Sequence, residues 1–201
     1  MYLTKVVLDQ GDPKVRHALL DCQKMHQLVM RLFDEDRQTS QVLYRTNHKK
    51  GKLEVYIYSG IPVTPAARES FDLVQKDMSA WLSQMGNDLV LQFDLIASPC
   101  KKVEFEGKRR SQRRVLKTPD ERNAWLHRKA AQYGFQIISV LERDYFKISG
   151  RHDSAKGGNM NHAAYHYQGV LRITDAELFQ NALQSGIGPG KAYGLGMMLV
   201  K

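Results

Sequence analysis

A glycine-rich segment near the C-terminus is the most distinctive group of residues that could bind a ligand. Its glycines and its lysine are Gly186, Gly188, Gly190, Gly194, Gly196 and Lys191. The segment is not a P-loop, because the Gly-Lys pair is followed by Ala192 rather than Ser or Thr. Its backbone N–H groups could hold an anion, with Lys191 adding positive charge. A tight turn between a helix and a strand explains the glycines equally well.

Histidine is the side chain whose pKa lies nearest neutrality, so a well-placed histidine is a candidate general acid or base. His26 follows Met25 in a segment where apolar residues recur at steps of three and four, which is typical of a helix. On an ideal helix it lies about 100° from Met25, at the rim of the apolar stripe. The residues alone favour a half-buried helix histidine without a chemical role.

Neither cysteine pattern nor histidine spacing indicates a metal site. The chain has two cysteines, Cys22 and Cys100, which are too few and too far apart for a zinc site or a disulfide framework. The histidines show no metal-ligand spacing with acids or cysteines. We expect no metal and no cofactor.

Positive charge is concentrated in the middle of the chain. The net charge is +9, and residues 99–131 hold 11 basic and 4 acidic residues, whereas residues 1–98 hold 12 of each. Such clustering is the electrostatic pattern of a protein with a phosphate-rich partner. A solvated basic face is the alternative interpretation.

Two similar series of elements are predicted to position these residues. The first half has strands at 1–8, 42–45, 53–58 and 89–96 and helices at 13–33 and 66–84, which gives the order βαββαβ. In the second half, Thr118 and Glu121 form a capping box that opens a helix. Strands are expected at 102–106, 135–141, 164–173 and 192–200, with a second helix between 174 and 186. We therefore predict an α+β fold of two tandem ferredoxin-like (RRM-like) domains, 1–98 and 99–201, with a linker near 98–102.

The N-terminus lacks a basic region followed by a long apolar one, so no signal peptide is predicted. No apolar run approaches the ~20 residues that cross a bilayer. With only two cysteines, the composition fits a reducing compartment. We expect a cytoplasmic protein that has no contact with a membrane.

The glycine segment has the pattern Gly-h-Gly, five residues, Gly-h-Gly, where h is apolar. This pattern resembles the signature of CRISPR repeat-cleaving proteins built from ferredoxin-like domains. Three further stretches resemble the CasE branch of that superfamily, which is the RNA-processing subunit of the type I-E Cascade complex. They are residues 1–6 (MYLTKV), 124–126 (AWL) and 168–171 (QGVL). The helix with Met25 and His26 resembles this branch as well.

The resemblance implies an endoribonuclease that cuts CRISPR repeat stem-loops in precursor RNA without a metal. The ribose 2′-hydroxyl would attack the adjacent phosphate and leave a 2′,3′-cyclic phosphate. His26 matches the catalytic histidine of the family. Where the family tends to carry a helping tyrosine, this chain has Gln23, an amide that can position a phosphate but cannot titrate as a phenol does.

Five residues after the histidine, the family places a basic residue, which here is Arg31, a good clamp for a phosphate. On a straight helix Arg31 points about 140° away from His26. Both side chains can therefore reach one phosphate only if the helix ends or bends between them.

The resemblance also implies which residues hold the RNA stem, since duplex RNA is gripped mainly through its phosphates and shape. Besides the glycine segment and Lys191, these are Lys101, Lys102, Lys108, Arg109, Arg110, Arg113, Arg114, Arg128, Lys129 and Lys156. The expected partners are the repeat RNA and the other Cascade subunits, and the free protein is expected to be a monomer. The main alternative is a module of the same fold that binds structured RNA without cutting it. A binder of double-stranded DNA has no helix-turn-helix or zinc-finger pattern to support it.

Overall fold

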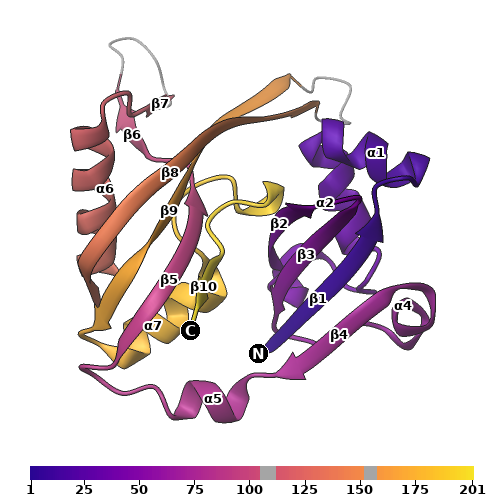
Figure 1. Ribbon diagram of the computed structural model, residues 1–201, viewed down its shortest axis with the longest axis horizontal. Coiled ribbons are helices and arrows are strands. Elements are labelled where there is room, and N and C mark those ends of the chain that lie inside the picture. The colour runs from indigo at the N-terminus through magenta and orange to yellow at the C-terminus, as the bar shows by residue number, and fades with distance from the viewer. Residues whose placement is uncertain (105–111, 152–157) are drawn as a thin grey trace.

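A computed structural model describes residues 1–104, 112–151 and 158–201 (Figure 1). Within these ranges the chain forms two four-stranded antiparallel sheets and a separate hairpin. In each sheet the first strand lies between the third and fourth strands of its own unit, which is the ferredoxin-like arrangement. The predicted α+β fold of two tandem ferredoxin-like units is confirmed.

The first sheet has the strand order β2-β3-β1-β4. Its strands are β1 (Tyr2–Asp9), β2 (Leu43–Lys49), β3 (Lys52–Ser59) and β4 (Asp72–Asp77). The helices of this half are α1 (Pro13–Leu20), α2 (Cys22–Met30), α3 (Arg37–Ser40), α4 (Pro65–Ser70) and α5 (Ser79–Ser83). Met25 and Val29 of α2 pack in one buried cluster with Val6, Val55 and Ile57 of the sheet, so the apolar stripe of α2 faces the core.

The helix predicted at 13–33 is divided into α1 and α2. Asp21 lies between them in an extended conformation, and its carboxylate accepts hydrogen bonds from the backbone N–H groups of Gln23 and Lys24. Such a side chain satisfies N–H groups that have no partner within the helix. Asp21 therefore fixes the start of α2, the helix that carries His26.

The prediction of one helix at 66–84 is wrong. The chain instead forms α4, then the strand β4, then the short α5. Strand β4 pairs with β1 along its whole length, with Leu73 opposite Val6, and so completes the first sheet. Pairing with a distant strand decides the structure here, and helical spacing over 66–84 does not reveal that partner.

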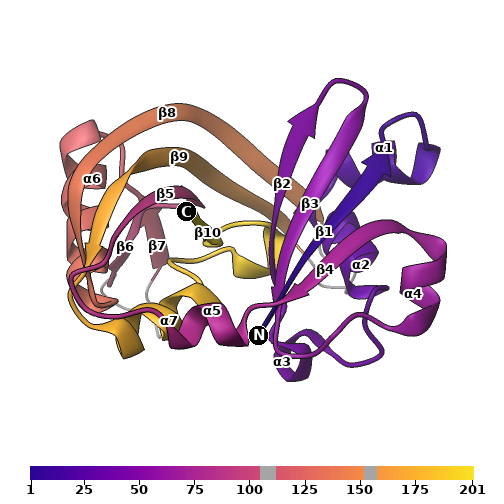
Figure 2. The same ribbon diagram turned by 60° about the horizontal axis from the view of Figure 1, so that its bottom comes forward.

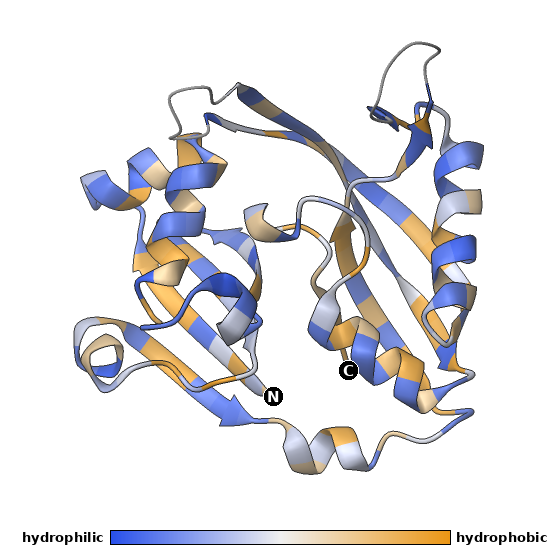
Figure 3. Ribbon diagram, turned by 180° about the vertical axis from the view of Figure 1, so that it is seen from behind, coloured by the Kyte–Doolittle hydropathy of each residue, from blue (hydrophilic) through white to orange (hydrophobic). Residues whose placement is uncertain are grey.

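The second sheet has the order β10-β5-β9-β8. Its strands are β5 (Val90–Ala97), β8 (Phe135–Arg151), β9 (Asn159–Ile173) and β10 (Met198–Val200). Two helices cover it: α6 (Pro119–Gln132), which opens with the predicted capping box, and α7 (Ala176–Ser185). Figure 3 shows α6 as hydrophilic over most of its length, while Trp125 and Leu126 are buried in the core of this unit.

Strand β5 belongs to the second sheet rather than the first, because it pairs with β9 and β10. The two sheets therefore divide the chain between Asp77 and Val90, not near residue 98 as the sequence suggested. The position beside β1 that a fourth strand must occupy is already taken by β4. Residues after β5 form a hairpin of β6 (Cys100–Val103) and β7 (Gln112–Val115), where one strand at 102–106 was expected.

The two units contact each other through apolar and charged side chains. Leu43 and Tyr58 of the first unit are buried together with Met197 of the second. The Arg45 Nη1 atom lies 2.5 Å from the Asp94 Oδ1 atom of β5, and Arg45 is buried. The segment between α7 and β10 passes between the two units (Figures 1 and 2). No helix within the described ranges is long and apolar enough to cross a membrane.

Candidate active site and nucleic-acid interface

The glycine segment forms a closed loop between α7 and β10. The Ile187 N–H donates to the Gly196 carbonyl over 2.9 Å, and the Gly196 N–H donates to the Ile96 carbonyl over 2.7 Å. Gly196 has φ +86°, and a Cβ there would lie 2.7 Å from the Ile187 carbonyl oxygen. Tight packing therefore explains this glycine, as the turn interpretation expected. The tip of the loop is the 3-10 turn η1 (Lys191–Tyr193), so the strand predicted at 192–200 is confined to Met198–Val200.

His26 lies on α2 opposite η1. Its imidazole is half-buried and meets the ring of Tyr193 edge-on, with the ring centroids 6.3 Å apart. Burial lowers the pKa of His26, and the positive charge of Arg37 lowers it further, while the backbone of Ala192 opposes this shift. The buried Nδ1 atom has no hydrogen-bond partner among the described residues. The lowered pKa favours the neutral imidazole at pH 7, which is the form that can accept a proton.

Tyr193 also contacts a second histidine. His162 of β9 lies with its ring centroid 5.6 Å from that of Tyr193. Burial lowers the pKa of His162, and the charge of Arg113 lowers it further. Burial raises the pKa of the Tyr193 phenol, so the phenol keeps its proton. The site thus combines neutral imidazoles from both units around one tyrosine of the glycine loop.

A cleft of about 720 Å³ runs past Tyr193 between the basic hairpin, α6 and the glycine loop. Its positively charged lining residues are Arg37, Lys101, Lys102, Arg113, Arg128, Lys129 and Lys191. Trp125, Tyr133, His162 and Tyr193 supply aromatic surface. His26 is not among the lining residues but borders the cleft through its contact with Tyr193. A groove with this charge and these rings can hold a nucleic-acid backbone.

Comparison with known proteins agrees with this geometry. The family model described as CRISPR associated protein matches residues 1–201. The chain belongs to this family. It is 27% identical over 219 residues to the CRISPR-associated endoribonuclease Cse3 of Thermus thermophilus, covering 100% of this chain and 99% of the relative. It is 26% identical to the Cascade subunit CasE of Escherichia coli, covering 98% of both chains.

A solved structure of the CRISPR endoribonuclease Cse3 bound to a 19-nucleotide RNA is similar to this CRISPR-associated protein over 100% of both chains. Its TM-score is 0.82 and its sequence identity is 25%. The resemblance to the CasE branch predicted from the sequence is confirmed.

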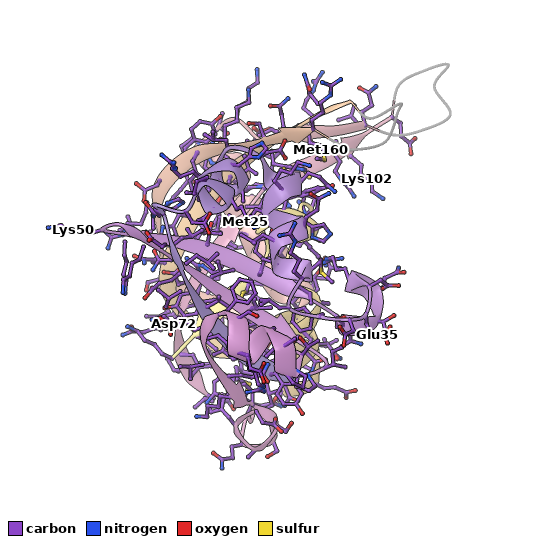
Figure 4. The ribbon with its side chains drawn as sticks, turned by 90° about the vertical axis from the view of Figure 1, so that its right-hand side faces the viewer. Met25, Glu35, Lys50, Asp72, Lys102 and Met160 are labelled. Atoms are coloured by element: carbon purple, nitrogen blue, oxygen red, sulfur yellow. The ribbon has the colours of Figure 1, made fainter. Side chains whose placement is uncertain are left out.

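The predicted RNA contacts of this CRISPR-associated protein fall into three groups. Those that line the cleft are Lys101, Lys102, Arg113, Arg128, Lys129, Gly188, Gly190 and Lys191. Gly186, Gly194, Gly196 and Arg114 lie outside the cleft lining. Arg114 is exposed on β7, and Gly194 lines a separate cavity that is bordered by residues of both units. Lys108, Arg109, Arg110 and Lys156 lie outside the described residues. Figure 4 shows Lys102, one of the cleft residues, on the opposite side of the molecule from Lys50.

Gln23 and Arg31 lie at the two ends of α2. Gln23 is half-buried in the first turn, where its N–H bonds to the Asp21 carboxylate over 2.8 Å. Arg31 is exposed and caps the helix, with its own N–H bonded to the Gln27 carbonyl, so the backbone stays helical from His26 to Arg31 and the end or bend that the sequence argument required between them is not found. The described contacts of Arg31 do not include His26. The catalytic roles of Gln23 and Arg31 stay predictions.

Three residues of the site were absent from the sequence-based assignment: Arg37, His162 and Tyr193. Tyr193 lies within the glycine pattern, so the pattern itself could have drawn attention to it. Nothing in the sequence relates Arg37 to His26, because α3 is short and irregularly spaced from α2. Within the described ranges, no group of three or more His, Cys, Asp or Glu side chains is arranged to hold a metal ion.

Proposed function

We propose that the chain is an endoribonuclease that cuts CRISPR repeat stem-loops in precursor RNA to give guide RNA with a 2′,3′-cyclic phosphate. The observation that carries this proposal is His26, a neutral, half-buried imidazole packed against Tyr193 at the edge of a strongly basic cleft. The names of the relatives Cse3 and CasE support the same activity and substrate. The first unit supplies His26, and the second supplies most of the basic cleft.

The reaction needs no metal if side chains transfer the protons and stabilise the negative charge on the phosphate. The 2′-oxygen forms a bond to phosphorus as the bond from phosphorus to the 5′-oxygen breaks. One proton leaves the 2′-hydroxyl and one reaches the departing 5′-oxygen. His26 is the titratable side chain that we assign to this proton transfer, since its neutral form can accept a proton at pH 7. Cations in the cleft stabilise the extra negative charge on the phosphate.

We further propose that the protein acts in the cytoplasm, stays bound to its product stem-loop and joins the other Cascade subunits. The relative CasE is named as a Cascade subunit, which supports this assembly. The cleft that binds the substrate stem would bind the product stem through the same phosphates.

The activity is tested by incubating the protein with its own repeat stem-loop RNA in EDTA. A matched RNA carries a 2′-deoxy nucleotide before the cut position. We expect cleavage of the first RNA to a 2′,3′-cyclic phosphate, and binding without cleavage of the second, because the second lacks the nucleophile. Tight binding with no cleavage of either RNA would instead indicate the non-catalytic RNA-binding module.

A further inference from the structure

Arg37 is a charged residue of the candidate site with no role assigned so far. It is the first residue of α3, is half-buried and lines the cleft together with Lys191 and Tyr193. Its positive charge lowers the pKa of His26. The guanidinium and the imidazole therefore lie within electrostatic range of each other and beside the same cleft.

No carboxylate neutralises Arg37 in the part of the chain that the structure describes. The neighbouring Asp36 uses its Oδ1 atom to cap α3, accepting from the N–H groups of Gln38 at 2.7 Å and Thr39 at 2.9 Å. Glu35 is exposed at the edge of the molecule (Figure 4). The Arg37 Nε atom is buried and has no hydrogen-bond partner within the described ranges. Among these residues the guanidinium is thus held without a counter-ion.

A half-buried cation without a counter-ion is unfavourable, and an anionic ligand relieves that cost. Burial lowers the pKa of Lys191, and the charges of Arg37 and Lys129 lower it further, so three cations act on one region of the cleft. Guanidinium can donate two parallel hydrogen bonds to a phosphate, which makes it the better of the two basic side chains for this ligand. Both the charge and its geometry favour a phosphate group here.

We propose that Arg37 is a catalytic residue that binds the scissile phosphate and neutralises the charge that develops on its non-bridging oxygens. This inference rests on the proposed function. Arg37 donates N–H hydrogen bonds and exchanges no proton, so the balance of the cleavage step is unchanged. Arg37 thereby takes the role that the sequence resemblance implied for Arg31, which is exposed at the end of α2.

The test compares single-turnover cleavage by Arg37→Ala and Arg37→Lys with that of Arg16→Ala, an exposed arginine of α1. With RNA saturated by protein, Arg37→Ala is expected to slow cleavage about 100-fold or more, while Arg37→Lys keeps an intermediate rate and Arg16→Ala keeps the wild-type rate. Added guanidinium is expected to restore part of the Arg37→Ala rate. The proposal would be overturned if Arg37→Ala cleaved RNA within about threefold of the wild-type rate. It would also be overturned if Arg31→Ala lost cleavage while Arg37→Ala kept it.

A pH profile separates a catalytic role from a purely structural one. The groups that face His26 are Arg37 from α3 and Ala192 and Tyr193 from η1. Arg37→Gln removes a charge that lowers the pKa of His26, so the acidic limb of the rate profile should move to higher pH. An acidic limb that does not move contradicts the proposal.

The outcomes also distinguish the two proposals. If the wild-type protein cuts no RNA, both the proposed function and the role of Arg37 fail. If His26→Ala stops cleavage and Arg37→Ala does not, only the role of Arg37 fails.

Discussion

At the scale of single residues, the site depends on how burial tunes one imidazole. His26 belongs to a helix whose other side is packed into the core, so its ring cannot reach full hydration. Burial penalises the charged form and lowers the pKa, and the nearby guanidinium of Arg37 acts in the same direction. The protein thus holds a base in its neutral form beside a cation that attracts phosphate.

The lowered pKa of His26 predicts the pH dependence of cleavage. The pH dependence of kcat/KM reports ionisation in the free protein. As the pH is raised, we expect kcat/KM to increase about tenfold per pH unit and then to reach its plateau before pH 6.5, because the pKa of His26 is lowered from 6.5, the ordinary pKa of histidine. The measurement is kcat/KM between about pH 4.5 and pH 8, a range that extends to both sides of the ordinary pKa of histidine. A limb that levels off only above pH 7.5, about one unit higher than an unperturbed histidine, would contradict a neutral buried base.

The residues of the site were only partly predictable. His26 was assigned through resemblance, because a helix histidine beside an apolar stripe has no pattern that distinguishes a base from a structural residue. Arg37 and Tyr193 lie far apart in the sequence, and only the docking of the glycine loop onto α2 and β2 brings them together. No local pattern carries information about such a long-range contact.

At the scale of elements, the basic hairpin distinguishes neighbouring arginines. In the β6–β7 pair, Arg113 lies opposite Lys102 and Arg114 lies opposite Lys101. Arg113 lines the cleft and lowers the pKa of His162, whereas Arg114 is exposed outside the cleft lining.

We therefore expect Arg113→Glu to weaken RNA binding more than Arg114→Glu. Each RNA phosphate that the variant no longer neutralises should reduce the slope of log K against log salt by about 0.7–0.9. The measurement is the dissociation constant at several salt concentrations, with Lys50→Glu on the opposite side as the control (Figure 4). Equal effects of the two arginine variants would place the stem elsewhere on the hairpin.

The elements also show where sequence periodicity succeeds and fails. The apolar stripe of α2 and the capping box of α6 are local signals, and both predictions agree with the structure. The helix predicted at 66–84 failed because β4 gains its stability from pairing with β1, about 70 residues away in sequence. The same pairing displaced β5 into the second unit, which is why the expected boundary near residue 98 does not follow the sheets.

At the scale of the whole molecule, the site depends on two units that keep a fixed relationship. Arg45 of the first unit pairs with Asp94 of the second, and His166 and Gln168 hydrogen-bond to the same carboxylate. Burial alone would raise the pKa of Asp94, but the hydrogen bond from Gln168 and the attraction of Arg45 and His166 outweigh it and lower the pKa. Asp94 is therefore ionised in the folded protein at neutral pH.

Arg45→Ala is expected to lower the free energy of unfolding by about 1–3 kcal/mol, because it leaves a partly buried carboxylate without its cation. The pKa of Asp94 is lower in the folded protein than in the unfolded chain. The ionised carboxylate therefore stabilises the folded state at pH values above its pKa in the unfolded chain, and this stabilisation is lost as the pH falls through its pKa in the folded protein. The difference between wild type and Arg45→Ala should thus be constant at neutral pH and shrink below about pH 4. Denaturant unfolding at several pH values measures it, with Arg16→Ala as the control. A difference that grows below pH 4 would contradict this account of the pair.

The most direct test of the central claim is the single-turnover cleavage rate of His26→Ala in EDTA. His17→Ala, an exposed histidine of α1, is the matched control. RNA binding is measured in parallel by filter retention. We predict that His26→Ala binds the stem-loop as wild type does but cleaves it at least about 100-fold more slowly, while His17→Ala cleaves normally. Cleavage by His26→Ala at the wild-type rate would contradict the assignment of His26 as the residue that moves the proton.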